Sequence, residues 1–426
     1  MELKKYKLAD IAKIEISGVD KKTIEGETPV RLCNFVDVYY NWAVTKEKAK
    51  SFMAASAKQT EIDKCSIGKG MVAITKDSET RDDIGVATYI ADDFENVVLG
   101  YHCALIIPNS AIVNGKYLNA FMHTRYIQKY FENNASGSGQ RYTLSNDTIG
   151  NILVLLPSIE EQHIIGNVLA DIDRKIELNK QINDNLEAMA KQFYDYWFVQ
   201  FDFPNEEGMP YKSSGGEMVW NEKLKREIPQ GWVVEKMGKC TNVLLGGTPD
   251  TNDNSLWGNG YNWLNSGEVA EFPILKSEKN ITPKGLEKSA TVLAPKGSVT
   301  LSITRHLRPS ILCIDACINQ SVVAILENDK VSKEYIYPLL NRDIPRLMSL
   351  RTGAQQPHIN KETVEAINVV LPPANIMGAY INIAESIYNA IFNNAKEVEE
   401  LTKQRDELLP LLMNGQATIN YHLSDD

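Results

Sequence analysis

The chain has 426 residues, of which 43% are hydrophobic and 23% charged, and its formal net charge is −10. This length predicts two or three domains, and the sequence contains no apolar run of the roughly 18–20 residues that a membrane span needs, so we expect a cytoplasmic protein. A net negative charge argues against DNA binding unless the acidic residues are confined to particular segments of the chain. Acidic residues are concentrated in 158–200, 201–231 and 374–426, whereas 1–157 and 232–373 are close to neutral.

Motifs for catalysis or metal binding are missing from the sequence. The histidines form no spaced cluster and the six cysteines form no C-x-x-C pair, so we expect no metal site. The turn Gly246-Gly247-Thr248-Pro249 lacks the Lys-Ser/Thr of a phosphate-binding loop. An adenine methyltransferase would carry an Asp/Asn-Pro-Pro-aromatic tetrapeptide, but Pro372-Pro373 follows a leucine and precedes a helical segment. We therefore expect no catalytic residue and no cofactor in this chain.

Two distant segments of the chain match each other without a gap. Residues 137–157 read GSGQRYTLSNDTIGNILVLLP and residues 352–372 read TGAQQPHINKETVEAINVVLP. The closing prolines, Pro157 and Pro372, are 215 residues apart. Such self-similarity predicts a repeated structural unit.

The repeat extends upstream with a looser match. Tyr117-Leu118 resembles Tyr335-Ile336, and residues 71–88 resemble residues 298–315. The two longer segments alternate apolar and polar positions on both sides of a polar centre, which predicts two strands around a turn. Each half of the chain therefore contains one mixed domain of strands and helices.

After Pro157 and Pro372 the pattern becomes helical for about forty residues, over 158–200 and 374–416. Apolar residues recur every three or four positions in one heptad phase, which is coiled-coil spacing. The scaffold positions are Ile172, Ile176, Leu186 and Phe193 in the first helix, and Ile387, Ile391, Leu401 and Leu408 in the second. Two ordinary amphipathic helices on separate domains are the alternative, but helices in globular proteins are usually much shorter.

Asn179 and Asn394 interrupt the apolar seam near the middle of each helix. An Asn in such a seam costs stability but fixes the register, because it needs a polar partner. An antiparallel pairing would bring the two together. The same pairing would place Ile172 near Leu401, Leu186 near Ile387, and Phe193 near Tyr380. A pair of helices about 57 Å long would then carry one domain at each end, in inverted orientation, and could measure the distance between two short DNA sites.

Candidate DNA contacts are basic and amide side chains at equivalent places of the two halves. Arg and Lys bond guanine edges or phosphates, and Gln and Asn bond adenine edges. The central turns supply Lys76 and Arg81, and Arg305, His306 and Arg308. The loops before each Leu-Pro supply Gln140, Arg141 and Tyr142, and Gln355, Gln356 and His358. Lys58 is the last lysine of a lysine-rich segment. This segment is either an edge that faces DNA phosphates or a solvated helix. The alternative for each candidate is an ordinary solvated surface residue.

Three long segments resemble the specificity subunits of type I restriction-modification systems. LPSIEEQHIIGNVLADIDRKIELNKQINDNLEAMAKQFYDYWFVQFDFP (156–204) resembles the family's central conserved region, and ELTKQRDELLPLLMNGQ (400–416) resembles its distal one. PYKSSGGEMVWNEKLKREIPQGW (210–232) is similar to the connector before its second recognition domain. The expected organisation is target recognition domain 1 over 1–157, central helix 158–200, linker 201–231, target recognition domain 2 over 232–373, distal helix 374–416 and tail 417–426.

The resemblance implies an α/β fold with two similar recognition domains built on mixed β-sheets and two long helices in an antiparallel coiled coil. It implies that each domain reads one half of a bipartite site in double-stranded DNA, and that the helices dock two methyltransferase subunits and then motor-nuclease subunits. S-adenosylmethionine, ATP and Mg²⁺ would bind those partners. Two alternatives remain open: a specificity subunit for a fused methyltransferase-nuclease of the type IIB kind, and a coiled-coil scaffold without a DNA role.

Overall fold

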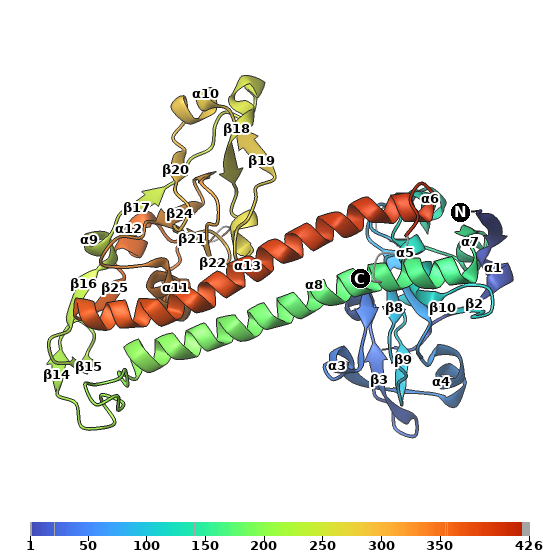
Figure 1. Ribbon diagram of the computed structural model, residues 1–426, viewed down its shortest axis with the longest axis horizontal. Coiled ribbons are helices and arrows are strands. Elements are labelled where there is room, and N and C mark those ends of the chain that lie inside the picture. The colour runs from blue at the N-terminus through green and yellow to red at the C-terminus, as the bar shows by residue number, and fades with distance from the viewer. Residues whose placement is uncertain are drawn as a thin grey trace, which may run out of the picture. The chain divides into compact units, whose positions relative to one another are not determined.

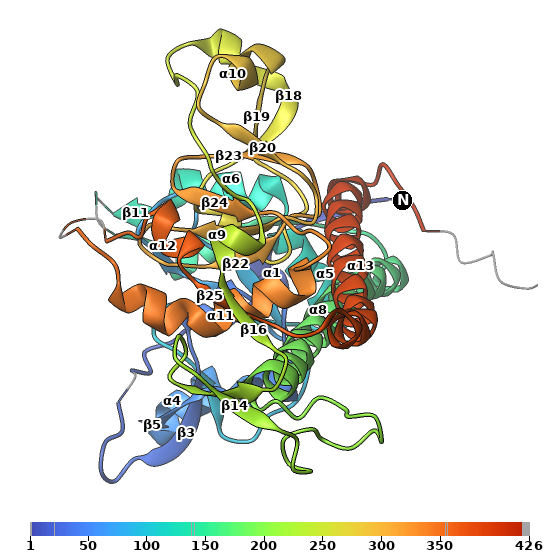
Figure 2. The same ribbon diagram turned by 90° about the vertical axis from the view of Figure 1, so that its left-hand side faces the viewer.

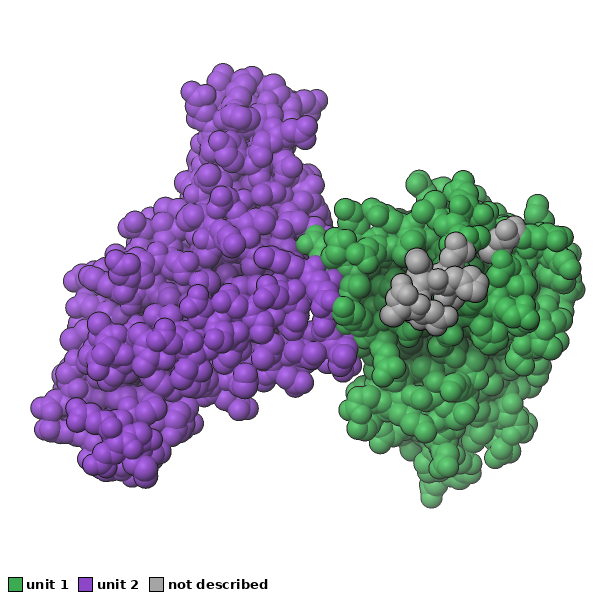
Figure 3. Space-filling model, viewed as in Figure 1, with its two compact units in different colours: residues 1–177, 399–426 green, residues 178–398 purple. Residues whose placement is uncertain are grey.

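The computed structural model describes residues 2–20, 22–137, 139, 141–353, 355 and 357–419. The chain forms two compact units. Unit 1 comprises residues 1–177 and 399–426, and unit 2 comprises residues 178–398 (Figure 3). Figure 1 shows the two long helices, α8 (Ile159–Tyr194) and α13 (Ala374–Met413). Each helix contributes one stretch to unit 1 and another stretch to unit 2.

The main sheet of unit 1 has five strands in the order β2-β10-β6-β8-β4. These strands are β2 (Ala12–Ile16), β4 (Ala43–Val44), β6 (Val72–Thr75), β8 (Ala87–Ile90) and β10 (Cys103–Pro108). Every residue of the central strands β6 and β8 is buried, as expected for apolar strands covered on both faces. A second sheet has the order β5-β3-β9, with β3 parallel to β9. Its strands are β3 (Thr28–Cys33), β5 (Met53–Ala57) and β9 (Val97–Leu99).

Unit 2 has a related topology, with one strand fewer in its main sheet and one more in its second sheet. Its main sheet has the antiparallel order β17-β24-β21-β22, and its second sheet the order β19-β18-β23-β20 with β18 parallel to β23. The main strands are β17 (Val243–Leu245), β21 (Val299–Ser302), β22 (Pro309–Ile311) and β24 (Val322–Ile325). The second sheet contains β18 (Trp257–Leu264), β19 (Lys279–Ile281), β20 (Val292–Ala294) and β23 (Ala316–Ile318). In Figure 2 this second sheet and α10 (Pro283–Glu287) project from the rest of unit 2.

The ends of the repeated part of each unit are built alike. The antiparallel pair β1 (Lys4–Lys7) and β13 (Leu153–Leu156) sets Lys4 opposite Leu156. The pair β16 (Val233–Lys236) and β25 (Asn368–Leu371) sets Val233 opposite Leu371. The short helices that accompany them also correspond: α1 (Leu8–Ile11) with α9 (Met237–Cys240), and α7 (Asn146–Gly150) with α12 (Lys361–Glu365). The repeat and the α/β fold with mixed sheets are therefore confirmed.

The remaining elements differ in number or length between the units. Unit 1 adds the short strands β7 (Asp77–Ser78), β11 (Ser136–Gly137) and β12 (Tyr142–Thr143). It also contains α2 (Phe35–Tyr39), α3 (Lys46–Ala49), α4 (Gln59–Cys65), α5 (Gly115–Met122) and α6 (Arg125–Asn134). Unit 2 has α11 (Lys333–Ser349) and, inside the segment expected to be a linker, the hairpin of β14 (Met218–Asn221) and β15 (Arg226–Pro229).

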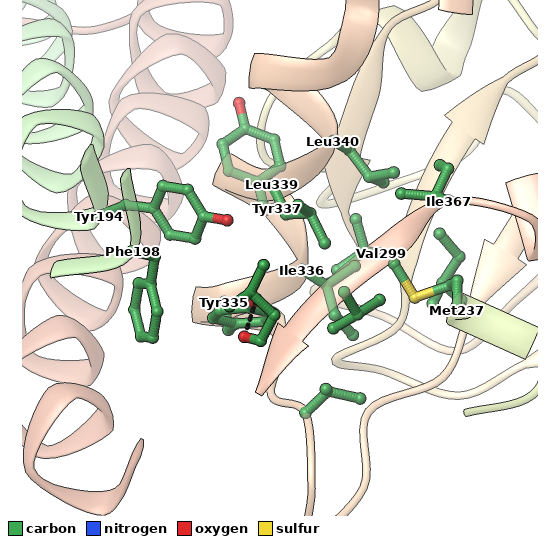
Figure 4. Packing of buried hydrophobic residues seen from close by; sticks show 14 of the residues in the cluster. Tyr194, Phe198, Met237, Val299, Tyr335, Ile336, Tyr337, Leu339, Leu340 and Ile367 are labelled. Atoms are coloured by element: carbon green, nitrogen blue, oxygen red, sulfur yellow. Dashed lines mark hydrogen bonds between the residues drawn. The ribbon is translucent and has the colours of Figure 1, made fainter. Parts of the chain in front are cut away.

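A buried tyrosine ties the last strand of each repeat to the core. The Tyr117 hydroxyl donates to the Leu155 carbonyl at 2.7 Å, and the Tyr335 hydroxyl donates to the Val370 carbonyl at 2.6 Å. Both tyrosines are fully buried. Figure 4 shows Tyr335 beside Phe198, whose ring centroid lies 4.8 Å away. The aromatic residues at the end of α8 and just after it, Tyr194 and Phe198, are thus part of the core of unit 2.

The two long helices run antiparallel within each unit. In unit 1, Arg405 of α13 lies 3.6 Å from Asp173 of α8. In unit 2, the rings of Phe193 and Tyr380 stack at 5.1 Å, so this predicted contact is present. The ten predicted scaffold positions are all buried or half-buried.

The expected Asn179–Asn394 pairing is replaced by other hydrogen bonds. Asn394 donates to the side chain of Asn183 at 3.0 Å, and Asn179 donates to Glu397 at 2.8 Å. Side chains on a helix lean toward its N-terminus. In an antiparallel pair, facing side chains therefore lean in opposite directions, and each amide reaches a partner about one turn away from the residue directly opposite.

Candidate nucleic-acid interface

The predicted turn and the predicted loop of unit 1 lie next to each other. The chain leaves β6 at Thr75 and enters β7, which pairs with β12 so that Asp77 faces Thr143 and Ser78 faces Tyr142. This small sheet brings together candidates that are separated by about 60 residues of sequence. Arg81, from the turn, also contacts Tyr142, from the loop: its guanidinium lies 4.9 Å from the centre of the Tyr142 ring.

Asp77 organises the charged side chains of this turn. Its Oδ2 lies 2.9 Å from Lys76 Nζ, 2.8 Å from His102 Nδ1 and 3.0 Å from Arg141 Nη2. Burial by itself would raise the pKa of Asp77, but hydrogen bonds from Thr143 and these three side chains outweigh it and hold the pKa well below its ordinary value. The ionised carboxylate therefore anchors Arg141, which remains exposed.

The candidates in this turn differ in accessibility. Lys76 is buried and ion-paired, and its ammonium lies 5.2 Å from the centre of the Tyr101 ring. It supports the turn and does not face solvent. Arg81 and Arg141 are exposed, and Tyr142 is half-buried. The surface of this turn thus presents two guanidinium groups, one stacked on a ring and one held by a carboxylate.

Unit 2 brings the equivalent turn and loop together. Thr304 and His358 form a bridge, and His358 lies 215 residues after Thr143, the residue that pairs with Asp77. The Arg305 backbone N–H donates to the Pro357 carbonyl at 2.9 Å, and Arg351 Nη1 donates to the Arg305 carbonyl at 2.7 Å. Two loops expected from the sequence repeat therefore meet in both units.

Arg305 lies at the tip of this turn with a φ of 55°. A left-handed conformation is uncommon for a residue other than glycine and is held here by contacts on both sides. The side chains of Arg305, His306, Arg308, Gln355 and His358 are all exposed. Thr304 stands where unit 1 has Asp77, so the cations of this turn have no carboxylate at that position.

Comparison with known proteins identifies the family of the chain. The family model described as "Type I restriction modification DNA specificity domain" matches residues 2–188 and 229–403. The chain belongs to this family. The interpretation as a type I restriction-modification specificity subunit, made from the long helical segments, is confirmed.

Curated relatives match most of the chain of this specificity subunit. It is 24% identical over 321 residues to the type I restriction enzyme MjaIX specificity subunit of Methanocaldococcus jannaschii, covering 74% of this chain and 71% of that protein. It is 23% identical over 393 residues to the HindI specificity subunit of Haemophilus influenzae, covering 80% and 85%. The type I S subunit structure from M. genitalium has the same fold, with a TM-score of 0.58 at 14% identity and coverage of 97% and 96%.

The other candidate residues lie elsewhere. Lys58 is exposed between β5 and α4, on the second sheet of unit 1, and is not part of the turn formed by β7 and β12. The nearby Lys48 is paired with Glu177 of α8 at 3.4 Å. Gln140 and Gln356 lie outside the described residues.

Three contributors to the two turns were not expected from the sequence. Asp77 and His102 hold Arg141, and Arg351 holds the backbone of Arg305. His102 comes to the turn only because the register of β10 on β6 places Cys103 opposite Thr75. A single acidic residue in a polar turn carries no pattern that would single it out.

Metal-ligand clusters and helices able to cross a membrane are both missing from the part of the chain that the structure describes. Among those residues there is no group of three or more His, Cys, Asp or Glu side chains that could hold a metal ion. No helix among them has both the length and the apolarity needed to cross a membrane.

Proposed function

We propose that each unit of this specificity subunit reads one half of a bipartite DNA target through its turn and loop. The observation that carries the proposal is the repeated juxtaposition: Asp77 with Thr143 in unit 1, and Thr304 with His358 in unit 2. Around these pairs the exposed candidates are Arg81, Arg141 and Tyr142, and Arg305, His306, Arg308, Gln355 and His358.

The side chains suggest what each turn would read. Arg141 is oriented by a carboxylate, and a preorganised guanidinium suits bidentate bonding to the O6 and N7 atoms of guanine. In unit 2, Gln355 has the chemistry for adenine, while Arg305 and Arg308 suit guanine or phosphate. Lys76 supports the turn from its buried position, and Lys58 is assigned to phosphate neutralisation.

The proposal leaves catalysis to partner subunits. This chain would transfer no methyl group and cut no DNA; S-adenosylmethionine, ATP and Mg²⁺ would bind the methyltransferase and motor-nuclease partners. The support is membership in a DNA specificity family.

An exposed apolar stripe on α8 suits a methyltransferase partner. Leu178, Ile182 and Met189 of α8 are 53%, 38% and 47% exposed, and Tyr196, in the π-helical turn Asp195–Val199 that follows α8, is 36% exposed. Their spacings of four, seven and seven residues place them on one helix face. Contiguous exposed apolar residues are typical of protein interfaces, so this face is assigned to docking two methyltransferase subunits together with the corresponding region of α13, where Ile383 is 49% exposed.

Selection from a random-sequence DNA pool tests the DNA role. The chain reconstituted with the methyltransferase encoded beside it should enrich two short motifs at one fixed spacing. A coiled-coil scaffold without a DNA role would enrich nothing. Salt-sensitive binding without enrichment would reduce the role to phosphate attraction.

Two double variants, one in each unit, test which unit reads which half of the DNA target. Arg81→Gln with Arg141→Gln should relax only one half-motif, and Arg305→Gln with Arg308→Gln only the other, by about tenfold to a hundredfold for each lost base contact. Lys330→Gln, an exposed change elsewhere in unit 2, should leave both motifs intact. If both pairs weakened binding to all sequences equally, the turns would contact phosphate only.

Two further assays test the partners. Methyl transfer by the purified chain alone would contradict the proposal, whereas transfer that appears only with the methyltransferase agrees with it. Cleavage at fixed distances on both sides of the target by a fused methyltransferase-nuclease would instead identify the type IIB arrangement.

A further inference from the structure

Unit 2 contains a basic cavity that the DNA-reading proposal does not use. The cavity has a volume of about 420 Å³ and lies among the end of α8, the β14–β15 hairpin, α11 and the start of β25. Its wall includes five cations and one acid: Lys223, Arg226, Lys236, Arg342, Arg346 and Asp343.

Two of the five cations have carboxylate partners. Arg346 forms a bidentate contact with Asp343, and Arg342 lies 2.9 Å from Asp195. Their charges are largely balanced by these acids, so they contribute little to the net charge of the cavity.

The other three cations are bound by neutral acceptors. Lys223 Nζ donates to the Val234 carbonyl at 2.6 Å. Lys236 Nζ donates to the Ala366 carbonyl at 2.9 Å and to the Asn368 side-chain oxygen at 2.7 Å. These bonds orient the ammonium groups without neutralising them.

Arg226 is held in the same way. Its guanidinium donates to the carbonyls of Phe198 and Val199 and lies 4.5 Å from the centre of the Phe201 ring. Burial, and after it the charge of Arg342, lower the pKa of Arg226. Like charges thus converge on one hollow, an arrangement that an anion entering it would stabilise.

We propose that this cavity binds a small phosphate-bearing ligand. Its volume lies within the usual range of small-molecule sites, roughly 300–1,000 Å³. Tyr194, Leu339 and Ile367 also line the cavity and add apolar surface to it, as ligand pockets commonly have. None of the exposed turn residues assigned to DNA lines the cavity, so a phosphate of the DNA target is not the assigned occupant.

Titration calorimetry with sodium pyrophosphate tests the site on the full chain. The ionic strength is held constant with sodium chloride, so that general screening does not contribute. Saturable binding with one equivalent per chain is the expected result. Heat that does not saturate, or that chloride reproduces, would overturn the proposal.

Variants locate the binding. Lys223→Gln with Lys236→Gln should weaken pyrophosphate binding at least about tenfold, because two charge-assisted hydrogen bonds are lost. Lys223→Gln alone should give an intermediate loss and serves if the double variant fails to fold. The matched control is Lys225→Gln in the same hairpin, since Lys225 is exposed, pairs with Glu222 and does not line the cavity. Equal affinity in all variants would overturn the assignment.

Competition distinguishes the source of the phosphate. Saturating duplex DNA carrying the target should leave pyrophosphate affinity unchanged, which supports a separate small-molecule site. Displacement of pyrophosphate by the duplex would replace the proposal with a DNA backbone contact. The result is independent of whether the turns read bases, which the pool selection measures separately.

Discussion

Asn394 donates its side-chain amide to the side-chain oxygen of Asn183 at 3.0 Å, and Asn183 in turn donates to the Ile391 carbonyl at 3.1 Å. Both residues are half-buried in the antiparallel helix pair of unit 2. Their hydrogen bonds form a polar layer beside apolar residues of the two helices, such as the buried Ile391 and Ala190. A layer of this kind fixes the register of the two helices.

Removing one member of this layer should destabilise unit 2. Asn394→Leu leaves the Asn183 oxygen without its donor in a half-buried seam, and we expect a loss of about 1–2 kcal/mol in unfolding free energy. Asn183→Leu with Asn394→Leu removes both polar groups and should recover most of that loss. Urea unfolding of the original chain, the two single variants and the double variant gives a double-mutant cycle. If the losses in unfolding free energy of the single variants simply add up in the double variant, the hydrogen bond contributes nothing to stability.

The tyrosine that anchors the last strand of each repeat offers a matched pair of tests. Tyr335→Phe and Tyr117→Phe each remove a buried hydroxyl, leaving the Val370 or Leu155 carbonyl without that donor, and each should cost about 1–3 kcal/mol. Thermal unfolding measures the loss. Tyr126→Phe is the control, because Tyr126 is 51% exposed and should change stability little. Similar losses in the two variants would support equivalent roles, whereas an effect in only one would contradict them.

The repeat made much of the fold predictable from sequence. The gapless match over 137–157 and 352–372 includes α7 with α12 and β13 with β25, and these elements correspond residue by residue. Tyr117 and Tyr335 were also recognisable, because the tyrosine recurs in both halves. The heptad phase predicted the helix pair and the stacking of Phe193 on Tyr380.

Other features depend on interactions that no pattern records. In each second sheet one strand, β3 or β18, has an antiparallel and a parallel neighbour, but β18 has eight residues and β3 has six, and their sequences share no motif. The cluster around Asp77 needs His102, which arrives through strand register. The hydrogen bonds of Asn179 and Asn394 depend on the direction in which side chains lean, and heptad positions do not specify that direction.

His123 makes the stability of unit 1 depend on pH. Its ring stacks on Trp42 at 4.2 Å, and burial, followed by the charge of Arg405, lowers its pKa from 6.5 to about 4. Between these values the unfolded chain binds a proton that the folded chain does not. Stability should therefore be constant above about pH 7 and fall as the pH drops from 6.5 to 4, by at most about 3 kcal/mol.

Melting temperatures of variants between pH 4 and pH 8 measure this effect. His123→Phe keeps a flat ring against Trp42 and should reduce the slope of melting temperature against pH between pH 4 and 6.5. Arg405→Gln should make the fall smaller and end it at a higher pH, since removing a charge that disfavours the imidazolium raises the folded pKa of His123 toward 6.5. His163→Gln changes an exposed histidine of the same unit and should leave the slope as it is. An unchanged slope in His123→Phe would assign the pH dependence to other groups.

Asp77 links the stability of unit 1 to the way its turn presents Arg141. Hydrogen bonds from Thr143, His102, Lys76 and Arg141 overcome burial and depress the pKa of Asp77. A depressed carboxyl pKa contributes stability above its unfolded value of about 3.9, and that contribution is lost as the pH falls below it. Asp77→Asn should therefore lower the melting temperature at pH 7, and the difference from the unmodified chain should shrink below about pH 4.

The same substitution should also affect recognition. Without the carboxylate, Arg141 loses its anchor at 3.0 Å, so the half-motif read by unit 1 should be recognised less selectively in the pool selection, while the other half-motif stays unchanged. Asp83→Asn is the matched control, because Asp83 accepts from the Tyr39 hydroxyl and has no contact with Arg141 among the described hydrogen bonds. If Asp77→Asn lost stability but kept both motifs, the carboxylate would serve folding alone, and Arg141 would not depend on it for reading DNA.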